Sequence, residues 1–530
     1  MYLAEKDQLS QGVDTDWDVI VIGAGAVGLV AAVSLARAGV KVLLLETGSA
    51  EPGEAQDLNQ VSITGRAHSG ALHGRARVVG GTTTLWGGQL TQFVPYDFEA
   101  RAIMPDAVWP ISFREVERYY ADVAKLLGLD LTHLSDASLL AASDGPAAAE
   151  SGCEFFFTRW LRESNLARWF AHDLNDRPNL AVAPSCHASE ILCADDESRI
   201  TGVRVHAKDG GRRDLRARQI VLACGTIEIS RLLLLTGRKN PAWTWCANPN
   251  IGAFFQDHLD LIIGKVQVND KRRFADRFEN LVVNGFKYQP KIRMLGPTLR
   301  REGLLNIACS MRFDSRVTED LQALKQFIKA LRNGTTVARP IETLRRIAAL
   351  NRVWFPLIWR YLRHRRVLAI ADRGIGVIAH CEQRPMRESR ISLEPARLDR
   401  FGDPIARLHW VLDEELQIKS LQCFAVHLQR FLESTAGAEL IADPALTSRD
   451  VRLLTEASDS YHQCGGARMG TSAAQGVVDA DCKVFGTGNL YVAGAAVFPC
   501  ASFANPTYTA MALARRLCDK LMGERQSARV

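Results

Sequence analysis

The chain has 530 residues, of which 47% are hydrophobic and 23% are charged, and its formal net charge is +6. A single hydrophobic core stops growing near roughly 250 to 300 residues, so we expect two domains or more. The ordinary glycine content and the lack of a fixed-period repeat or low-complexity tract argue against solenoid and disordered classes.

The first sixteen residues are polar and mixed in charge, without the basic start and apolar run of a secretory signal. The twelve cysteines form no CxxC pair and no framework spacing, which is typical of reduced, buried thiols. Both features favour a cytoplasmic location. No histidine and cysteine cluster has metal-ligand spacing, so we expect no metal.

A glycine-rich turn between an apolar strand, residues 19–22, and a helix-forming segment opens the ordered part of the chain. The glycines of this GxGxxG pattern are Gly23, Gly25 and Gly28. A second apolar strand, residues 42–45, ends in Glu46. Strand, turn, helix and strand within about 30 residues predict a βαβ unit with parallel strands.

This unit has the residues that a bound dinucleotide requires. Gly23 permits the sharp turn, and Gly25 places no Cβ between the backbone and a pyrophosphate. Gly28 lets the helix approach the strand while the N–H groups at its start face the phosphates. Glu46 is then placed to accept hydrogen bonds from ribose hydroxyls, so the sequence predicts a nucleotide site.

The middle of the chain is rich in strand patterns. Residues 181–225 alternate as strands and are followed by a helix at 227–235. Residues 284–313 and 374–411 carry β-type alternation and turn signals, and we assign both to a sheet over the nucleotide, in a second domain. Residues 414–434 predict an amphipathic helix.

Further motifs follow the βαβ unit along the chain. They are the glycine-rich loop 74–88, the segments 224–228 and 250–258, and the C-terminal segments 461–470, 489–499 and 505–507. In type and order these motifs resemble those of the glucose-methanol-choline (GMC) oxidoreductase family. The resemblance covers most of the chain and leaves mainly a basic stretch outside it.

The resemblance implies an α/β fold with two domains. The first is a Rossmann-like FAD-binding domain of the glutathione-reductase type, assembled from residues 15–98, 180–262 and 455–526. The second is an α+β substrate domain built on an antiparallel-type sheet. It comprises residues 99–179 and 263–454, including a basic aromatic insertion at 323–367.

The resemblance also implies a reaction, in which a primary or secondary alcohol becomes a carbonyl by hydride transfer to flavin N5. His462 is the base, since a histidine has its pKa near the working pH, and Asn505 orients the substrate hydroxyl. The residues expected to bind FAD are Gly23, Gly25, Ala26, Gly28, Glu46, Arg75, Gly80, Gly81, Thr82, Trp86, Gly87, Gly88, Ala223, Gly225, Gly494, Ala495, Asn505, Pro506 and Thr507.

Two departures from the family pattern refine this expectation. Leu85 stands where relatives with covalent flavin have a histidine, so we expect non-covalent FAD. Residues 494–496 are Gly-Ala-Ala where many members have an acid, which resembles the pyranose-oxidase and sugar-dehydrogenase branch. A sugar, glycoside or polyol is the leading substrate, and the electron acceptor is oxygen, a quinone or a redox protein.

Rival functions stay open. The same fold could serve a hydroxynitrile lyase, in which the flavin never changes oxidation state, or a non-catalytic membrane-associated flavoprotein. A nicotinamide dehydrogenase is the least favoured. Among other polar residues, His380 and Glu382 could each point at the substrate, but alternation means that one face of such a strand must face something else. Cys464 and His258 are interpreted as structural.

Residues 325–366 carry eleven basic side chains and one acidic side chain. The net positive charge of this stretch is therefore larger than that of the whole chain. Within them, residues 353–366 mix aromatic rings with arginines, and Pro356 is expected to break or start a helix there. The stretch is too short and too charged to span a bilayer. It is either a peripheral membrane contact or a lid or oligomer contact, and no groove-reading motif points to nucleic acid.

Overall fold

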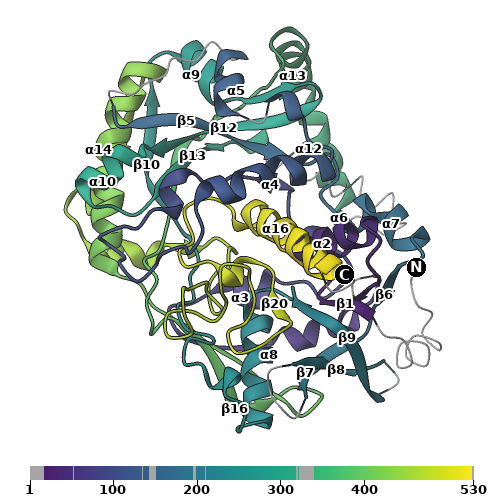
Figure 1. Cartoon of the computed structure of the whole chain (residues 1–530). Helices are drawn as coiled ribbons and strands as arrows, with labels where there is room; N and C mark the ends of the chain where they lie inside the picture. Colours follow the sequence, from purple (N-terminus) through teal and green to yellow (C-terminus); the bar gives the residue numbers. More distant parts are fainter. Residues whose placement is uncertain are drawn as a thin grey trace.

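The computed structural model describes residues 17–51, 53–133, 135–142, 151–194, 199–208, 210–317, 320, 327 and 339–527. Most of the predicted insertion before residue 339 therefore lies outside the described residues. Two large sheets and one small sheet form the framework, with helices packed between and around them (Figure 1). Helices not discussed further are α3 (Ser69–His73), α4 (Phe113–Leu126), α5 (Asp136–Ala142), α6 (Leu166–Trp169), α7 (Ala171–Asp176), α9 (Lys271–Phe278), α10 (Gly296–Glu302) and α15 (Pro444–Thr447).

The first sheet is parallel at its centre, as the βαβ pattern predicts. Its order is β6 (Leu180–Ala183), β2 (Val42–Leu45), β1 (Trp17–Ile22), β9 (Arg212–Leu222), β8 (Ile200–His206) and β7 (His187–Cys193), with β20 (Leu490–Val492) also paired to β9. The central strands are almost wholly buried, which explains their continuous apolar sequences. Helices α2 (Ala26–Arg37) and α16 (Pro506–Ser527) lie side by side against this sheet (Figure 1).

The second sheet is antiparallel throughout its long pairings, as expected for a substrate domain. Its order is β14 (Arg366–Val367), β11 (Asn280–Val283), β12 (Phe286–Met294), β13 (Ile307–Asp314), β15 (Gly374–Cys381), β10 (Leu259–Val268) and β18 (Ala438–Ala442), with β5 (Cys153–Trp160), β4 (Gln89–Leu90) and β19 (Ser458–Asp459) attached. Helix α14 (Glu414–Ala436), the predicted amphipathic helix, packs on this sheet.

One sheet assignment is wrong. Strands β16 (Arg390–Leu398) and β17 (Pro404–Trp410) do not join β15 but form a small sheet with β3 (Val61–Gly65). This sheet packs on α8 (Thr226–Lys239), the helix that the sequence predicts at 227–235. Alternation identifies a half-buried strand but not its partner, because pairing depends on distant residues.

The helix prediction for the basic aromatic stretch needs a correction as well. Helix α12 (Pro340–Ala349) is followed by α13 (Asn351–His364), which continues through Pro356. Pro356 is exposed, so water can reach the carbonyl of residue 352 that the missing N–H leaves free. No helix in the described part of the chain is long and apolar enough to cross a bilayer.

Candidate active site

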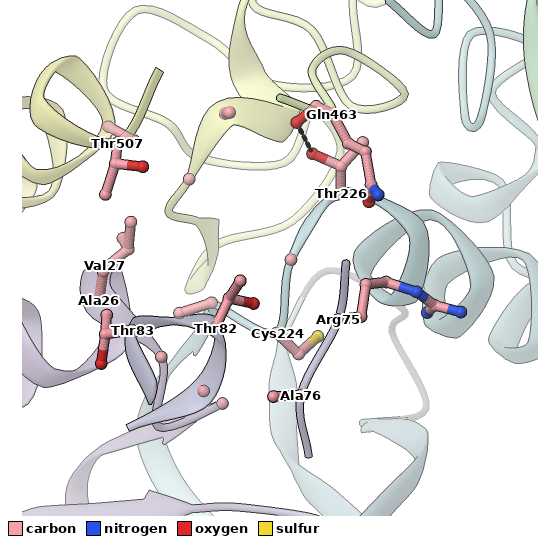
Figure 2. Close-up of a pocket in the computed structure, with 18 of the residues that line it drawn as sticks. Ala26, Val27, Arg75, Ala76, Thr82, Thr83, Cys224, Thr226, Gln463 and Thr507 are labelled. Carbon is pink, nitrogen blue, oxygen red and sulfur yellow. Dashed lines mark hydrogen bonds between the residues drawn. The ribbon is translucent and has the colours of Figure 1, made fainter. Parts of the chain in front are cut away.

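A cavity of about 470 Å³ lies at the carboxyl ends of the parallel strands, where doubly wound sheets bind nucleotides. Its walls include residues 22, 23, 25–27, 45–47 and 223–228, which lie at the carboxyl ends of β1, β2 and β9 or just after them. Figure 2 shows how segments distant in sequence meet there: Ala26, Thr82, Cys224, Gln463 and Thr507 lie around one space. The hydroxyl of Thr226 donates to the carbonyl of Gln463 at 2.7 Å and joins two of these segments (Figure 2).

Most of the residues predicted to bind FAD line this cavity. They are Gly23, Gly25, Ala26, Glu46, Arg75, Gly81, Thr82, Trp86, Gly87, Ala223, Gly225, Gly494, Ala495, Asn505, Pro506 and Thr507. Gly28, Gly80 and Gly88 do not line it, and their part in FAD binding stays a prediction. A Cβ on Gly28 would lie 1.8 Å from the Gly23 carbonyl oxygen, so Gly28 serves helix packing. Gly80 and Gly88 have positive φ, and their Cβ positions face neighbouring chain instead of the cavity.

The residues at the start of α2 fit the diphosphate of a dinucleotide. Gly25 is the N-cap, and no side chain caps the helix, so its first N–H groups are left for a ligand. A Cβ on Gly25 would meet no atom within 4 Å, which shows that open space lies beside its backbone. These features suit an anion that approaches the main chain closely.

Glu46, at the end of β2, is held in place by backbone donors. Its Oε2 accepts from the N–H of Ala24 at 3.0 Å, and its Oε1 accepts from the N–H of Gly48 at 2.8 Å. Burial raises the pKa of this carboxyl group, against these hydrogen bonds. The carboxylate lines the cavity with acceptor positions to spare, as a ribose diol requires.

Arg75 lines the cavity, but its guanidinium group forms a salt bridge with Glu228. Its Nη1 lies 2.8 Å from Glu228 Oε1, and Arg77 Nη2 lies 2.9 Å from the same oxygen. Burial alone would raise the pKa of Glu228, but these arginines and Arg231 hold it well below its ordinary value. The guanidinium of Arg75 is directed toward this cluster and away from the central space in Figure 2. Arg75 is thus a wall residue whose head group supports the loop.

A second cavity, of about 170 Å³, adjoins the first. Its walls come mainly from the antiparallel sheet and the C-terminal segment: Gln89, Thr91, Phe156, His258, Asp260, Lys291, His380, His462, Phe503, Ala504 and Asn505. His462, Asn505 and Gln89 line both cavities. The two predicted catalytic residues therefore stand in the wall shared by the nucleotide cavity and a polar pocket.

His462 and Asn505 are directly hydrogen-bonded. Asn505 Nδ2 lies 3.0 Å from His462 Nε2, and the hydroxyl of Thr91 donates to Asn505 Oδ1 at 3.3 Å. The backbone N–H of His462 donates to Asp257 at 3.0 Å, so the imidazole is held from its own main chain too. This pair is the arrangement that the sequence predicts from residues 43 positions apart.

A second histidine decides which nitrogen of His462 carries the proton. His258 Nε2 lies 3.2 Å from the carbonyl of Ala501, which can only accept, so this nitrogen carries the hydrogen. In the neutral ring His258 Nδ1 is then an acceptor, and it lies 3.1 Å from His462 Nδ1. His462 must donate through Nδ1, which leaves a lone pair on Nε2, the nitrogen beside Asn505.

The electrostatics of the pair agree with this assignment. Burial, and next the neighbouring His258, hold the pKa of His462 well below its ordinary value. Burial also lowers the pKa of His258. Both rings are therefore neutral at pH 7, and Nε2 of His462 is available as a proton acceptor. The sequence interpretation of His258 as merely structural is corrected: it positions and orients the base.

We expect that replacing His258 with phenylalanine slows reduction of the bound flavin by about tenfold or more, because His462 loses the acceptor that selects its tautomer. His258→Gln should restore part of the rate, since its Oε1 can accept from His462 Nδ1. Nitrogen-15 NMR of the histidine rings is the second measurement: the variant with phenylalanine should show mixed His462 tautomers. Unchanged tautomer signals and an unchanged rate would contradict the role.

The other polar residues considered for the site lie in different surroundings. His380 lines the smaller cavity, whereas Glu382 is buried in a bidentate ion pair with Arg101, at 2.6 and 2.7 Å. Burial raises the pKa of the Cys464 thiol, which donates to the carbonyl of His462 and is no nucleophile. All twelve cysteines are described, and none forms a disulfide.

One group of metal-ligand type occurs among the described residues: His68, Asp257 and Asp459. Backbone donors already occupy it. Asp459 accepts from the N–H groups of Ser69 and Gly70, both at 2.7 Å, and the N–H of Ala71 donates to His68 Nδ1. The trio thus fixes the loops beside His462, and the expected absence of a metal stays a prediction.

Comparison with known proteins agrees with this geometry. Residues 385–514 match the family model described as GMC oxidoreductase, and residues 18–242 match the model described as FAD dependent oxidoreductase. The chain thus combines an N-terminal part that matches FAD-dependent oxidoreductases with a C-terminal part that matches GMC oxidoreductases. FAD, the cofactor predicted from the glycine pattern and the resemblance, is confirmed by the second model. Its non-covalent attachment stays a prediction, with Leu85 60% exposed and outside the cavity wall.

Individual relatives are distant. An alcohol dehydrogenase [acceptor] of Pseudomonas putida is 24% identical over 63% of this chain, and a paromamine 6'-oxidase of Streptomyces fradiae is 31% identical over 42%. These alignments span 56% and 50% of the two relatives' own lengths. A solved formate oxidase, 17% identical, covers 97% of this chain and 99% of its own, with a TM-score of 0.57. The last likeness confirms the fold alone.

Proposed function

We propose that this protein oxidises a primary or secondary alcohol of a small polyhydroxylated molecule to the carbonyl. The observation that carries the proposal is the shared wall: His462 and Asn505 face the nucleotide cavity on one side and a polar pocket on the other. The names of two relatives, an alcohol dehydrogenase [acceptor] and a paromamine 6'-oxidase, support the substrate class.

The residues divide the work of the reaction. FAD, when bound, supplies the acceptor for the hydride that leaves the carbinol carbon. Nε2 of His462 accepts the proton of the substrate hydroxyl, and the electron pair of that O–H bond forms the second carbon–oxygen bond. Asn505 Nδ2 carries a second hydrogen besides the one directed at His462, so it can hold the substrate oxygen in register.

The test is anaerobic mixing of the yellow holoenzyme with a panel of sugars, polyols and lipid alcohols. Loss of the oxidised-flavin absorbance with one class identifies the reaction and the substrate together. A hydroxynitrile lyase would cleave cyanohydrins without bleaching the flavin. A non-catalytic flavoprotein would show neither bleaching nor turnover with an artificial electron acceptor. No bleaching by any alcohol would overturn the proposal.

We further propose that helix α13 attaches the protein to a membrane surface, where a quinone could serve as electron acceptor. Its apolar side chains occupy one helix face and are largely exposed: Trp354 (45%), Phe355 (75%), Ile358 (53%), Trp359 (57%) and Leu362 (64%). Arg363 and Arg365 at its C-terminal end are exposed. Rings and cationic groups together suit the headgroup region of an anionic bilayer.

Helix α13 is held to the rest of the molecule by ion pairs, so a membrane contact of this helix would attach the whole protein. Arg360 donates to Glu279 and Asp276, both at 2.6 Å, and so ties α13 to the end of the helix that precedes β11. In Figure 1 α13 and α12 lie at one edge of the molecule, next to the antiparallel sheet. The rival interpretation, an oligomer contact or lid through the same face, remains as an outcome of the test.

We expect the holoenzyme to float with vesicles that contain anionic lipid and not with purely zwitterionic ones. Changing Trp354 and Trp359 to serine should reduce the floating fraction by about tenfold, because two interfacial aromatic anchors are lost. Trp169→Ser, at a tryptophan 39% exposed on a different helix, is the matched control. If the unmodified protein stays at the bottom of the gradient and elutes as an oligomer that the double variant dissociates, the face is an oligomer contact.

A further inference from the structure

The smaller cavity contains a buried cation that the proposed reaction does not use. Lys291, on β12, is 8% exposed and lines the cavity together with His462 and Asn505. Its ammonium forms no hydrogen bond and no salt bridge with any residue in the described part of the chain. A buried ammonium with three unused donors is costly unless a ligand pairs with it.

The nearest acidic neighbour already has another partner. Asp260 Oδ1 lies 2.7 Å from His380 Nδ1, and His380 Nε2 lies 2.9 Å from the hydroxyl of Ser310. Burial would raise the pKa of Asp260, but His380 holds it well below its ordinary value, so the carboxylate is charged and engaged. Burial lowers the pKa of Lys291 to about 8, and Asp260 acts in the opposite direction. At pH 7 the ammonium is still mostly charged.

The rest of the wall is suited to hydroxyl groups. Gln89 Nε2 donates to Thr158 at 2.6 Å and to Gln289 at 2.7 Å, which leaves its Oε1 as an acceptor. Phe156 and Phe503 supply apolar faces that pack at 5.3 Å between ring centroids. The volume of about 170 Å³ equals that of roughly five or six water molecules. A small hydroxylated fragment fits, and its charge must be negative to pair with Lys291.

We infer that Lys291 binds a carboxylate of the substrate, and that the alcohol oxidised beside His462 therefore belongs to a hydroxylated carboxylic acid of the sugar-acid kind. This inference rests on the proposed function, since it names the substrate of the same site. A carboxylate is preferred over a phosphate because one lysine balances one negative charge, and because a phosphate dianion usually requires an arginine fork or several backbone donors.

Matched pairs of compounds test the inference. Gluconate and sorbitol have the same six-carbon hydroxylated chain, and only the carboxylate distinguishes them; glycerate and glycerol form a shorter pair. We expect the acids to bind the holoenzyme about tenfold to a hundredfold more tightly than the polyols, the range of a charge-assisted hydrogen bond. The measurements are the rise in thermal unfolding temperature with each compound and the anaerobic rate of flavin bleaching.

The variant Lys291→Met keeps an unbranched side chain, shorter by one atom, and removes the charge. It should lose the preference for the acids while its affinity for sorbitol stays within about twofold. Lys291→Arg should retain part of the preference. The flavin absorbance of each purified variant shows whether the fold and cofactor are intact, and the comparison of acid with polyol in the unmodified enzyme needs no variant at all.

The outcomes separate the two proposals. If polyols and acids bleach the flavin equally in the unmodified enzyme, or if Lys291→Met keeps the preference, Lys291 binds no carboxylate although the alcohol oxidation stands. If no alcohol bleaches the flavin, the proposed function fails, and a thermal shift with gluconate that Lys291→Met abolishes would still identify the carboxylate site. Equal thermal shifts with both compounds of a pair overturn the site itself.

Discussion

Replacing His462 with alanine is expected to slow reduction of the bound flavin by an alcohol at least about a hundredfold, the effect of losing a general base. The structure strengthens this expectation, since Nε2 of His462 carries the lone pair and Nδ1 is committed to His258. The rate is measured by stopped-flow absorbance under anaerobic conditions. His462→Gln should be equally slow, because an amide can hydrogen-bond but cannot accept the proton at neutral pH.

The loss must not be explained by a damaged fold or by missing cofactor. The flavin-to-protein absorbance ratio of the variants should equal that of the unmodified enzyme. His172→Ala, at a histidine whose side chain is 91% exposed, is the matched control and should reduce its flavin at the ordinary rate. Near-normal reduction in His462→Ala would show that the proton goes elsewhere.

The second large effect concerns the cofactor. Gly25→Val is expected to yield a folded protein that retains less than about a tenth of its FAD, because the new side chain occupies the space beside the start of α2. The backbone itself tolerates the change: Gly25 has φ −78° and ψ −171°, an extended conformation open to valine. Flavin absorbance per protein and far-ultraviolet circular dichroism are the two measurements.

Substitutions at two other glycines distinguish loss of FAD binding from loss of packing. Gly53→Val is the control, since its Cβ also meets nothing within 4 Å but lies outside the cavity wall, and it should keep its flavin. Gly28→Ala should fail differently, because its Cβ would lie 1.8 Å from the Gly23 carbonyl oxygen and prevent the helix from packing. A yellow, fully loaded Gly25→Val would mean that the diphosphate does not lie at this turn.

The catalytic pair shows how far motifs reach. His462 and Asn505 could be predicted because each stands in a local motif, and the structure places them 3.0 Å apart. The role of His258 could not be predicted in this way. Asp257 and His258 belong to the motif at residues 250–258, which marks the segment but not the role of the histidine. The tautomer of His462 depends on the hydrogen bonds that His258 makes with the carbonyl of Ala501 and with the ring of His462.

The residues of the smaller cavity could not be predicted from sequence motifs. Lys291 and Asp260 lie on β12 and β10, which do not pair with each other, and no short motif contains either residue. Their joint effect depends on the order of strands in the antiparallel sheet. The misassigned β16 and β17 illustrate the same limit, since alternation is equally compatible with several partner strands.

By itself the sequence determined the βαβ nucleotide site and the cofactor and pointed to His462 and Asn505 as the candidate catalytic pair, because each depends on residues close together in the chain or on motifs in a set order. The tertiary structure alone decided the tautomer of the base, the unpaired charge of Lys291 and the exposure of α13. These properties depend on which distant groups surround a side chain, and burial and hydrogen-bond partners are properties of packing that no local pattern contains.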